Sequence, residues 1–169
     1  ALDTVELYEW RGLLFISLSP EIPLEVQLGA LVLEIEDEPI EKYKWVHEER
    51  LVFDANWKIY TDNFVEGYHI PGIHPKFHSA IEFEKFETIA LEGMVKMTAP
   101  PREELFYRGK WLWMWPNWTL SLFEGGMNTS RINPINHQQT ELIYNFYFED
   151  ISKINAPKRA KIIADNMEV

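Results

Sequence analysis

The sequence predicts an α+β fold in which an antiparallel sheet wraps around a helix. Short segments rich in β-branched and aromatic residues follow one another through most of the second half of the chain. Two segments of helical character, 56–69 and 156–169, bracket these strands. A run of strands between helices, without regular alternation of the two, is typical of an antiparallel α+β arrangement.

Two strands are expected before the first of these helices. The apolar run at 13–18 predicts a buried strand, which ends at Ser19 and Pro20. The segment 42–54 alternates in part and is rich in aromatic and branched residues, so it also predicts a strand.

The segment 56–69 changes to a helical period. Trp57, Tyr60, Phe64 and Tyr68 recur at intervals of three or four residues, which places one apolar stripe on a helix. We expect this stripe to be part of the core and not a substrate surface. Pro71-Gly72 is expected to end the helix, and a loop is expected as far as Ser79.

The remaining elements are short strands and a final helix. Asn155 is expected to cap that helix, with Pro157 in its first turn. Trp111, Trp113 and Trp115 alternate and should share one face of a strand, either lining a pocket or packing on the helix. The strands are expected at 81–89, 91–98, 111–115, 119–124, 129–135 and 140–149.

Composition excludes several classes of protein. The 169 residues are enough for one domain with a sizeable core. Sixteen basic against 27 acidic residues give a net charge of −11, which argues against a nucleic-acid partner. The chain has no cysteine, which excludes disulfides and thiolate metal sites. Because no apolar run reaches the roughly 18 residues of a membrane span and no signal peptide is recognised, no membrane association and a cytoplasmic location are expected.

The residues suited to chemistry gather at 56–78. Three of the five histidines lie here, next to Asp62 and Glu66, and neutral imidazole is a good ligand for Fe, Zn, Cu or Ni. On an unbroken helix His69 and His74 would point about 140° apart, so they can share a metal only if Pro71-Gly72 breaks the helix. Two histidines and one carboxylate form the facial triad of non-haem Fe(II) oxygenases.

The other histidines are expected to have ordinary roles. His78 is a further candidate ligand, although a histidine at such a position is more often an ordinary loop residue. His47 and His137 are expected to be structural or exposed.

The same segment resembles the ferrous-iron motif of the α-subunits of Rieske ring-hydroxylating oxygenases. That motif reads N-W-K, then D/E-N, an acid, Y-H and H-P. The segments 10–20, 111–117 and 133–148 also look like this family's catalytic domain, so the resemblance extends over nearly the whole chain. The matching residues are Asn56, Trp57, Lys58, Asp62, Asn63, Glu66, Tyr68, His69, His74 and Pro75.

The resemblance implies a helix-grip fold of the START/Bet v 1 type, in which an antiparallel sheet wraps around a long helix. Residues 1–20 would be the tail of a preceding Rieske domain or a connecting strand. Residues 21–169 would be the catalytic iron domain, truncated at its C-terminus.

The resemblance also assigns the site residues. His69 and His74 would bind Fe(II), and Asn63 would lie near the iron without being a usual ligand. Glu66 would be the bridging acid that links the iron to a Rieske [2Fe–2S] cluster on the neighbouring subunit. The third ligand, an Asp, would fall beyond Val169, with Asp165 as a stand-in inside the chain. The cluster needs two Cys and two His, so it must be bound before Ala1.

The function implied by the resemblance is that of an oxygenase catalytic domain, not active alone. Electrons from NAD(P)H would pass through a reductase or ferredoxin and the Rieske cluster to mononuclear Fe(II). The iron and O2 would then hydroxylate or demethylate a small organic substrate, with the breakdown of aromatic compounds as one setting. The full-length protein would be a homotrimer or hexamer, and the wording E-G-Y-H-x-P leans toward the choline, carnitine and phenylpropionate-like members.

Two other functions remain open on the sequence. One is a non-catalytic helix-grip module that binds a ligand without metal. The other is a Zn hydrolase using the same histidines, although no general base is placed as in H-E-x-x-H. Neither of them explains the 56–74 segment.

Overall fold

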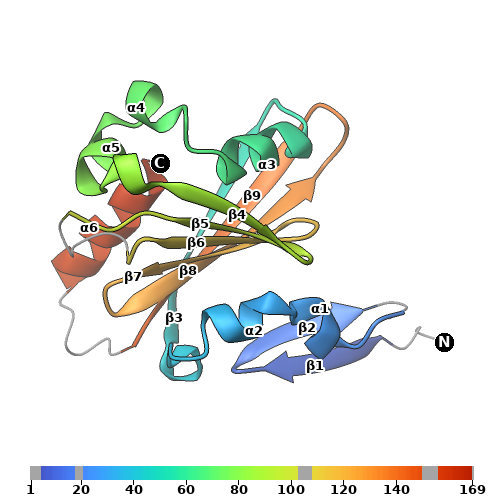
Figure 1. Cartoon of the computed structure of the whole chain (residues 1–169). Coiled ribbons are helices and arrows are strands. Elements are labelled where there is room, and N and C mark those ends of the chain that lie inside the picture. The colour runs from blue at the N-terminus through green and yellow to red at the C-terminus, as the bar shows by residue number, and fades with distance from the viewer. Residues whose placement is uncertain (1–4, 18–20, 103–107, 150–155, 169) are drawn as a thin grey trace.

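A computed structural model describes residues 5–17, 21–102, 108–149 and 156–168 (Figure 1). Its centre is an antiparallel seven-stranded sheet in the order β3-β9-β8-β7-β6-β5-β4. Each strand from β4 to β8 pairs with the next one along the chain, whereas β3 pairs with β9. The predicted α+β class with a large antiparallel sheet is therefore confirmed. The strands are β3 (Lys44–Phe53), β4 (Glu87–Leu91), β5 (Met94–Thr98), β6 (Lys110–Met114), β7 (Trp118–Phe123), β8 (Gly126–Pro134) and β9 (Thr140–Phe148).

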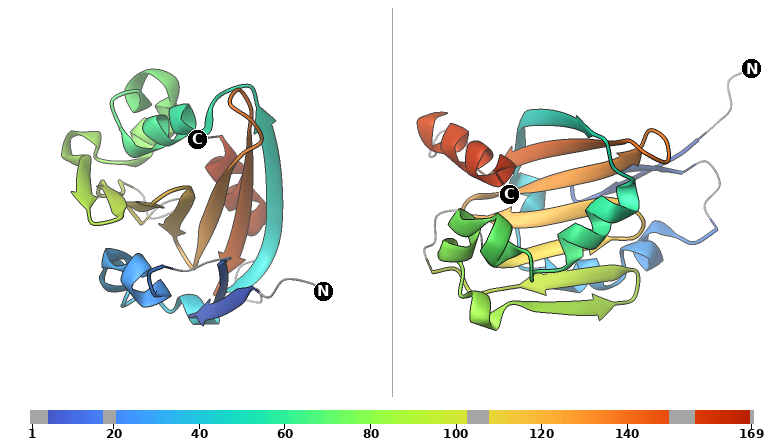
Figure 2. Two further views of the ribbon diagram at one scale, coloured as in Figure 1. Left: turned by 90° about the vertical axis from the view of Figure 1, so that its right-hand side faces the viewer. Right: turned by 90° about the horizontal axis from the view of Figure 1, so that it is seen from above.

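The two faces of the sheet are covered by different parts of the chain (Figures 1 and 2). One face packs against an N-terminal unit through buried residues such as Leu112 and Met114. This unit comprises β1 (Glu6–Trp10), β2 (Leu13–Ser17), α1 (Leu24–Leu28), α2 (Ala30–Glu34) and the 3-10 turn η1 (Ile40–Lys42).

The other face carries the remaining helices. Trp111 on β6, and Phe146 and Phe148 on β9, pack toward them. Alternate residues of one strand therefore serve two separate clusters, as strand geometry requires. The helices are α3 (Trp57–Val65), α4 (Ile70–Ile73), α5 (Pro75–Ala80) and α6 (Ala156–Met167), with a 3-10 turn η2 (Phe83–Lys85) after α5.

The long helix of a helix-grip fold stays a prediction. The longest helix in the described ranges is α6 with 12 residues, and α3 has nine. None of the helices described is long and apolar enough to cross a membrane. The last helix begins at Ala156 as expected, and its predicted cap, Asn155, lies outside the described residues.

The strand predicted at 13–18 is present as β2, but it is buried on one side only. It pairs with β1 in a two-stranded hairpin, so the predicted full burial was wrong. Leu13 and Phe15 pack against the core, whereas Leu14 and Ile16 are 68% and 72% exposed. The domain boundary at residue 20 stays a prediction, although the hairpin packs firmly on residues beyond it.

The helix predicted at 56–69 ends earlier than expected. Helix α3 ends at Val65, and Glu66 is extended with φ −115° and ψ 157°. Pro71-Gly72 does not break a helix, because both residues lie inside α4. Proline is tolerated in the first turn of a helix, since the backbone N–H groups there have no intrahelical partner. The loop expected up to Ser79 is instead helix α5, which begins at Pro75.

Candidate iron site and substrate pocket

The segment after β3 is fixed at its start by Asn56. The Asn56 side chain accepts a hydrogen bond from the backbone N–H of Lys58 at 3.0 Å and so caps α3. Its amide also donates to the backbone oxygen of His137 at 2.9 Å, which ties the start of the helix to the β8–β9 turn. Asn56, the residue that opens the matched motif, therefore fixes the start of α3.

A single helical turn separates His69 from His74. His69 precedes α4, and His74 lies between α4 and α5. The two rings come together with their centroids 5.1 Å apart at an interplanar angle of 78°. The expected approach of these rings is thus achieved by a short helix between them and not by a loop.

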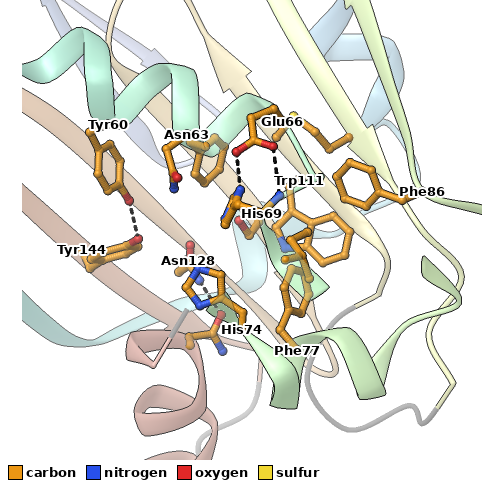
Figure 3. Close-up of a pocket in the computed structure, with 15 residues that line it drawn as sticks. Tyr60, Asn63, Glu66, His69, His74, Phe77, Phe86, Trp111, Asn128 and Tyr144 are labelled. Carbon is orange, nitrogen blue, oxygen red and sulfur yellow. Dashed lines mark hydrogen bonds and ion pairs between the residues drawn. The ribbon is translucent and has the colours of Figure 1, made fainter. Parts of the chain in front are cut away.

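Glu66 holds one ring nitrogen of His69 (Figure 3). Its carboxylate oxygen Oε1 contacts His69 Nδ1, and its Oε2 accepts from the backbone N–H of His69 at 3.4 Å. Because a carboxylate accepts, Nδ1 carries the proton and the lone pair of Nε2 is left for a metal. The two side chains are only 17% and 18% exposed, so solvent screens the interaction between them only weakly.

His74 is suited to the same task by its environment. Burial, and next the neighbouring His69, hold the pKa of His74 below its usual value. Its imidazole is therefore neutral at pH 7, which is the form that binds a metal. The donor set of two neutral imidazoles fits Fe(II), although it also suits other transition metals.

The rings of His69 and His74 open onto a pocket of about 710 Å³ that includes some open solvent. Most of the apolar lining comes from α3 to α5 and from the strand face that carries Trp111. These residues are Phe64, Ile70, Phe77, Phe86, Met97 and Trp111.

The polar part of the pocket joins the helices to the far strands. The hydroxyls of Tyr60 and Tyr144 lie 2.9 Å apart. Asn128 donates to Asn166 at 2.9 Å, and Asn166 donates to the backbone oxygen of Ile162 at 2.8 Å. The remaining polar lining residues are Asn63, Ser121, Glu66, His69 and His74.

Asp165, the stand-in for a third ligand, is used elsewhere. Its carboxylate is buried but pairs with Lys76 at 2.5 Å and with Lys161 at 2.7 Å, and it does not line the pocket. Within the described ranges no group of three or more His, Asp or Glu could hold a metal. A third ligand beyond Val169 therefore stays a prediction. The backbone of Glu168, at the end of α6, contacts the His74 ring.

Several sequence-based expectations for this region can be compared with the structure. Asn63 lines the pocket with Glu66, and its place near an iron stays a prediction. Tyr60 and Phe64 line the pocket as well, although they were expected to be core. Tyr68 was also expected to be core, which was wrong, because its side chain is 84% exposed.

The other predicted candidates lie apart from the pocket. His78 packs beside Phe83 with ring centroids 5.1 Å apart. His47 pairs with Glu49, and His137 and Asp62 are exposed. Trp111 lines the pocket, whereas Trp113 and Trp115 pack edge to face with each other at 6.0 Å.

The sequence reasoning missed the strand residues of the pocket: Tyr144, Ser121 and Asn128. Ser121 and Asn128 are buried polar residues, and a polar residue in a predicted strand is a candidate for a site. That signal was present in the sequence, but it does not say which face of the sheet each residue occupies.

Comparison with known proteins finds similarity to oxygenases. The family model for the ring-hydroxylating alpha subunit (catalytic domain) matches residues 40–97. The carnitine monooxygenase oxygenase subunit of Escherichia coli K12 is 29% identical over 168 residues, covering 87% of this chain and 43% of the relative. Chloroplastic choline monooxygenase of Beta vulgaris is 20% identical over 162 residues, covering 88% and 36%. The chain thus spans less than half the length of these relatives.

Solved structures agree on the fold. A quaternary ammonium Rieske monooxygenase aligns with a TM-score of 0.82 at 19% identity, covering 98% of this chain and 48% of that one. Naphthalene 1,2-dioxygenase from Rhodococcus sp. aligns with a TM-score of 0.63 at 20% identity, covering 96% and 48%. Together with the family match, these findings confirm the resemblance predicted from the 56–74 segment.

Proposed function

We propose that this relative of the Rieske ring-hydroxylating oxygenase α-subunits is the iron-binding and substrate-binding part of a longer enzyme. That enzyme would use O2 to hydroxylate or demethylate a small organic molecule. Its electrons would come from NAD(P)H through a reductase or ferredoxin and then a Rieske [2Fe–2S] cluster held outside this chain. The observation that carries the proposal is the pair of adjacent imidazoles, one of them oriented by Glu66, at the edge of an apolar pocket.

His69 and His74 would hold the metal, His69 through Nε2 because Glu66 occupies its Nδ1. When bound, Fe(II) would supply the activation of O2. The third ligand would be a carboxylate beyond Val169. The apolar side chains around the two rings would exclude water from the reacting centre.

Glu66 would have a second role. By the resemblance, it would link the iron to the cluster of a neighbouring subunit, which requires a trimer or hexamer. The position of Glu66 supports this, since one oxygen contacts His69 Nδ1 and the other lies 3.4 Å from a backbone N–H, leaving lone pairs free for a partner. Asn63 would lie near the iron without binding it.

The substrate class we propose is a quaternary ammonium compound, because related proteins are named for choline and carnitine. The pocket supports a cation. Glu66 is its one carboxylate, and neither Lys nor Arg is among the described lining residues. The faces of Phe64, Phe77, Phe86 and Trp111 could stabilise a trimethylammonium group by cation–π contacts. The apolar lining would also accept an aromatic hydrocarbon, which makes a role in aromatic breakdown the weaker alternative.

The test is the anaerobic Fe(II) content of the full-length parent protein, wild type beside the His69→Ala/His74→Ala double variant. We expect mononuclear iron to be lost from the variant while the Rieske signal is unchanged. A His47→Ala/His137→Ala variant is the matched control and should keep its iron. Equal iron in all three proteins would refute the ligand assignment and favour the non-catalytic ligand-binding module.

A further inference from the structure

Two tyrosines from distant parts of the chain meet inside the pocket. Tyr60 comes from α3 and Tyr144 from β9, 84 residues later, and their hydroxyl oxygens are 2.9 Å apart. Figure 3 shows the pair on the side of the pocket opposite Phe86, with Asn63 next to it. Both residues line the pocket, and neither belongs to the iron motif.

The pair has one hydrogen-bond donor more than it can use internally. Two phenols have two O–H groups, and the contact between them consumes only one. In the described part of the chain neither hydroxyl has another hydrogen-bond partner. One O–H is therefore left to point into the pocket, where a ligand that offers an oxygen would satisfy it.

Both hydroxyls stay protonated over the physiological range. Burial raises the pKa of Tyr144, and burial together with Tyr144 raises the pKa of Tyr60. The pair is therefore a neutral donor that carries no charge of its own.

The charges of the lining limit which oxygen can bind. Among the described lining residues there is no Lys or Arg to balance a carboxylate, and Glu66 is itself an anion. A carboxylate buried beside the tyrosines would find no lining side chain as a counter-ion, which is unfavourable in an apolar pocket. A neutral oxygen, such as an alcohol, avoids this cost and can also accept the free O–H.

We propose that the Tyr60–Tyr144 pair is a specificity determinant that donates a hydrogen bond to a neutral oxygen of the substrate, as in a quaternary ammonium alcohol. That the substrate is a quaternary ammonium cation rests on the function proposed above. The tyrosine pair would add selectivity for the group attached to that cation. The pair would recognise the substrate without taking part in the chemistry.

The test is equilibrium binding to the iron-loaded, full-length parent protein without oxygen. The probes are choline, ethyltrimethylammonium, which lacks only the hydroxyl, and trimethylglycine, which carries a carboxylate. The variants are Tyr144→Phe, Tyr60→Phe and the double variant Tyr60→Phe/Tyr144→Phe. Tyr147→Phe is the matched control, because Tyr147 lies on the same strand but packs on the other face of the sheet, with its hydroxyl bonded to Thr129.

We expect wild type and Tyr147→Phe to bind choline about five- to tenfold more tightly than ethyltrimethylammonium, as one hydrogen bond would give. The phenol that remains in a single variant can still donate, so only the double variant should reduce this preference to less than about twofold, with the affinity for ethyltrimethylammonium unchanged. Trimethylglycine should bind wild type more weakly than choline. The unchanged affinity for ethyltrimethylammonium also shows that the double variant is folded.

An unchanged preference in the double variant would overturn the proposal, and so would a wild type that does not distinguish choline from ethyltrimethylammonium or binds neither. Because binding is measured without oxygen, it is independent of turnover. Selective choline binding lost in the double variant, without oxidation of choline by the reduced wild-type enzyme and O2, would support the tyrosine pair and refute the proposed function.

Discussion

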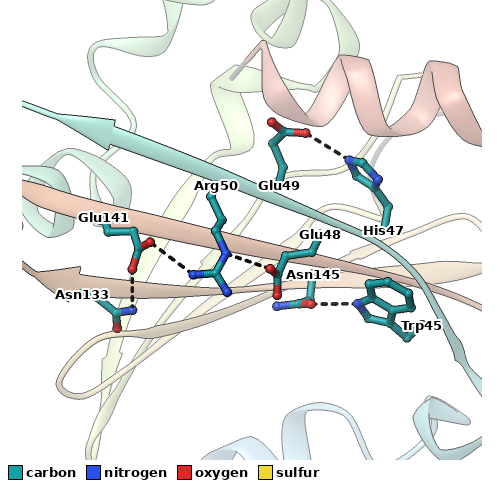
Figure 4. A network of polar contacts seen from close by, with 8 residues as sticks. All are labelled: Trp45, His47, Glu48, Glu49, Arg50, Asn133, Glu141 and Asn145. Carbon is teal, nitrogen blue, oxygen red and sulfur yellow. Dashed lines mark hydrogen bonds and ion pairs between the residues drawn. The ribbon is translucent and has the colours of Figure 1, made fainter.

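Two histidine–glutamate pairs of the same chemistry lie in different surroundings. His47 and Glu49 are on the edge strand β3, with Nε2 3.1 Å from Oε2 and side chains 41% and 43% exposed. They belong to a group of polar contacts on the sheet that includes Arg50 with Glu48 and Glu141 (Figure 4). His69 and Glu66 are less than half as exposed and lie beside a second histidine and an apolar pocket.

The comparison shows that a histidine next to a carboxylate does not by itself make a site. On β3 both partners are hydrated, so the pair adds little and solvent screens it. Beside the pocket, the carboxylate fixes the ring orientation, and His74 supplies a second donor within reach. Burial and a second donor distinguish the candidate site, and each can be tested.

The largest effect is expected from removing single histidines. His69→Ala should weaken Fe(II) binding by the parent protein by more than about 100-fold, because it would delete a proposed direct ligand and not merely an outer partner. His47→Ala should leave the affinity unchanged. Anaerobic titration with Fe(II) measures both, and an equal loss in the two variants would erase the distinction between the pairs.

Removal of the carboxylates comes next. Glu66→Ala should lower the Fe(II) affinity by about 10–100-fold, the usual effect of losing the group that orients a ligating histidine. The same substitution at Glu49 should have no effect on iron. If Glu66→Ala kept full affinity, Glu66 would have no orienting role for His69.

The backbone between Glu66 and His69 can be tested through its glycine. A Cβ at Gly67 would lie 2.4 Å from Cε1 of Phe86, so Gly67→Ala must displace that ring from the pocket wall. We expect a loss of about 1–3 kcal/mol in the free energy of unfolding, typical of overpacking. Gly72→Ala is the control, since nothing lies within 4 Å of its added Cβ. Urea unfolding of the two variants compares them, and equal stability would show that Phe86 adapts freely.

The smallest effect concerns pH. Because the pKa of His74 is lowered by burial, the unfolded chain takes up this proton before the folded chain does. Burial of the neutral His74 ring therefore costs no stability above about pH 6.5, and the folded state is destabilised as the pH falls below that value. In metal-free parent protein, His74→Gln should reduce the loss of stability between pH 7.5 and pH 5.5. His47→Gln serves as the exposed comparison, and identical pH profiles for wild type and His74→Gln would contradict the expected shift.

Much of the sheet could be predicted because its strands are short, branched and aromatic, and are bounded by turn residues. The helices around the site were harder. Pro71 and Gly72 were expected to end a helix, but proline is compatible with a helix start, and here it lies in the first turn of α4. The chain instead leaves α3 at Glu66, before Gly67, whose close approach to Phe86 is a tertiary contact that no local pattern reveals.

The candidate site divides in the same way. His69, His74, Glu66 and Asn63 could be found because they fall within one contiguous segment of the chain. Tyr144 and Asn128 could not, because their position depends on the register of β8 and β9 in the sheet. A shift of one residue in that register would turn both side chains to the opposite face.

The pairing of β3 with β9 also bears on how the pocket is made during synthesis. Tyr60 leaves the ribosome long before Tyr144, and β3 has no neighbour in the sheet until β9 is complete. Contacts this distant in sequence form slowly. During that interval β3 exposes unpaired backbone groups that other chains could bind. We therefore expect the nascent protein to depend on chaperones until the last strands have been translated.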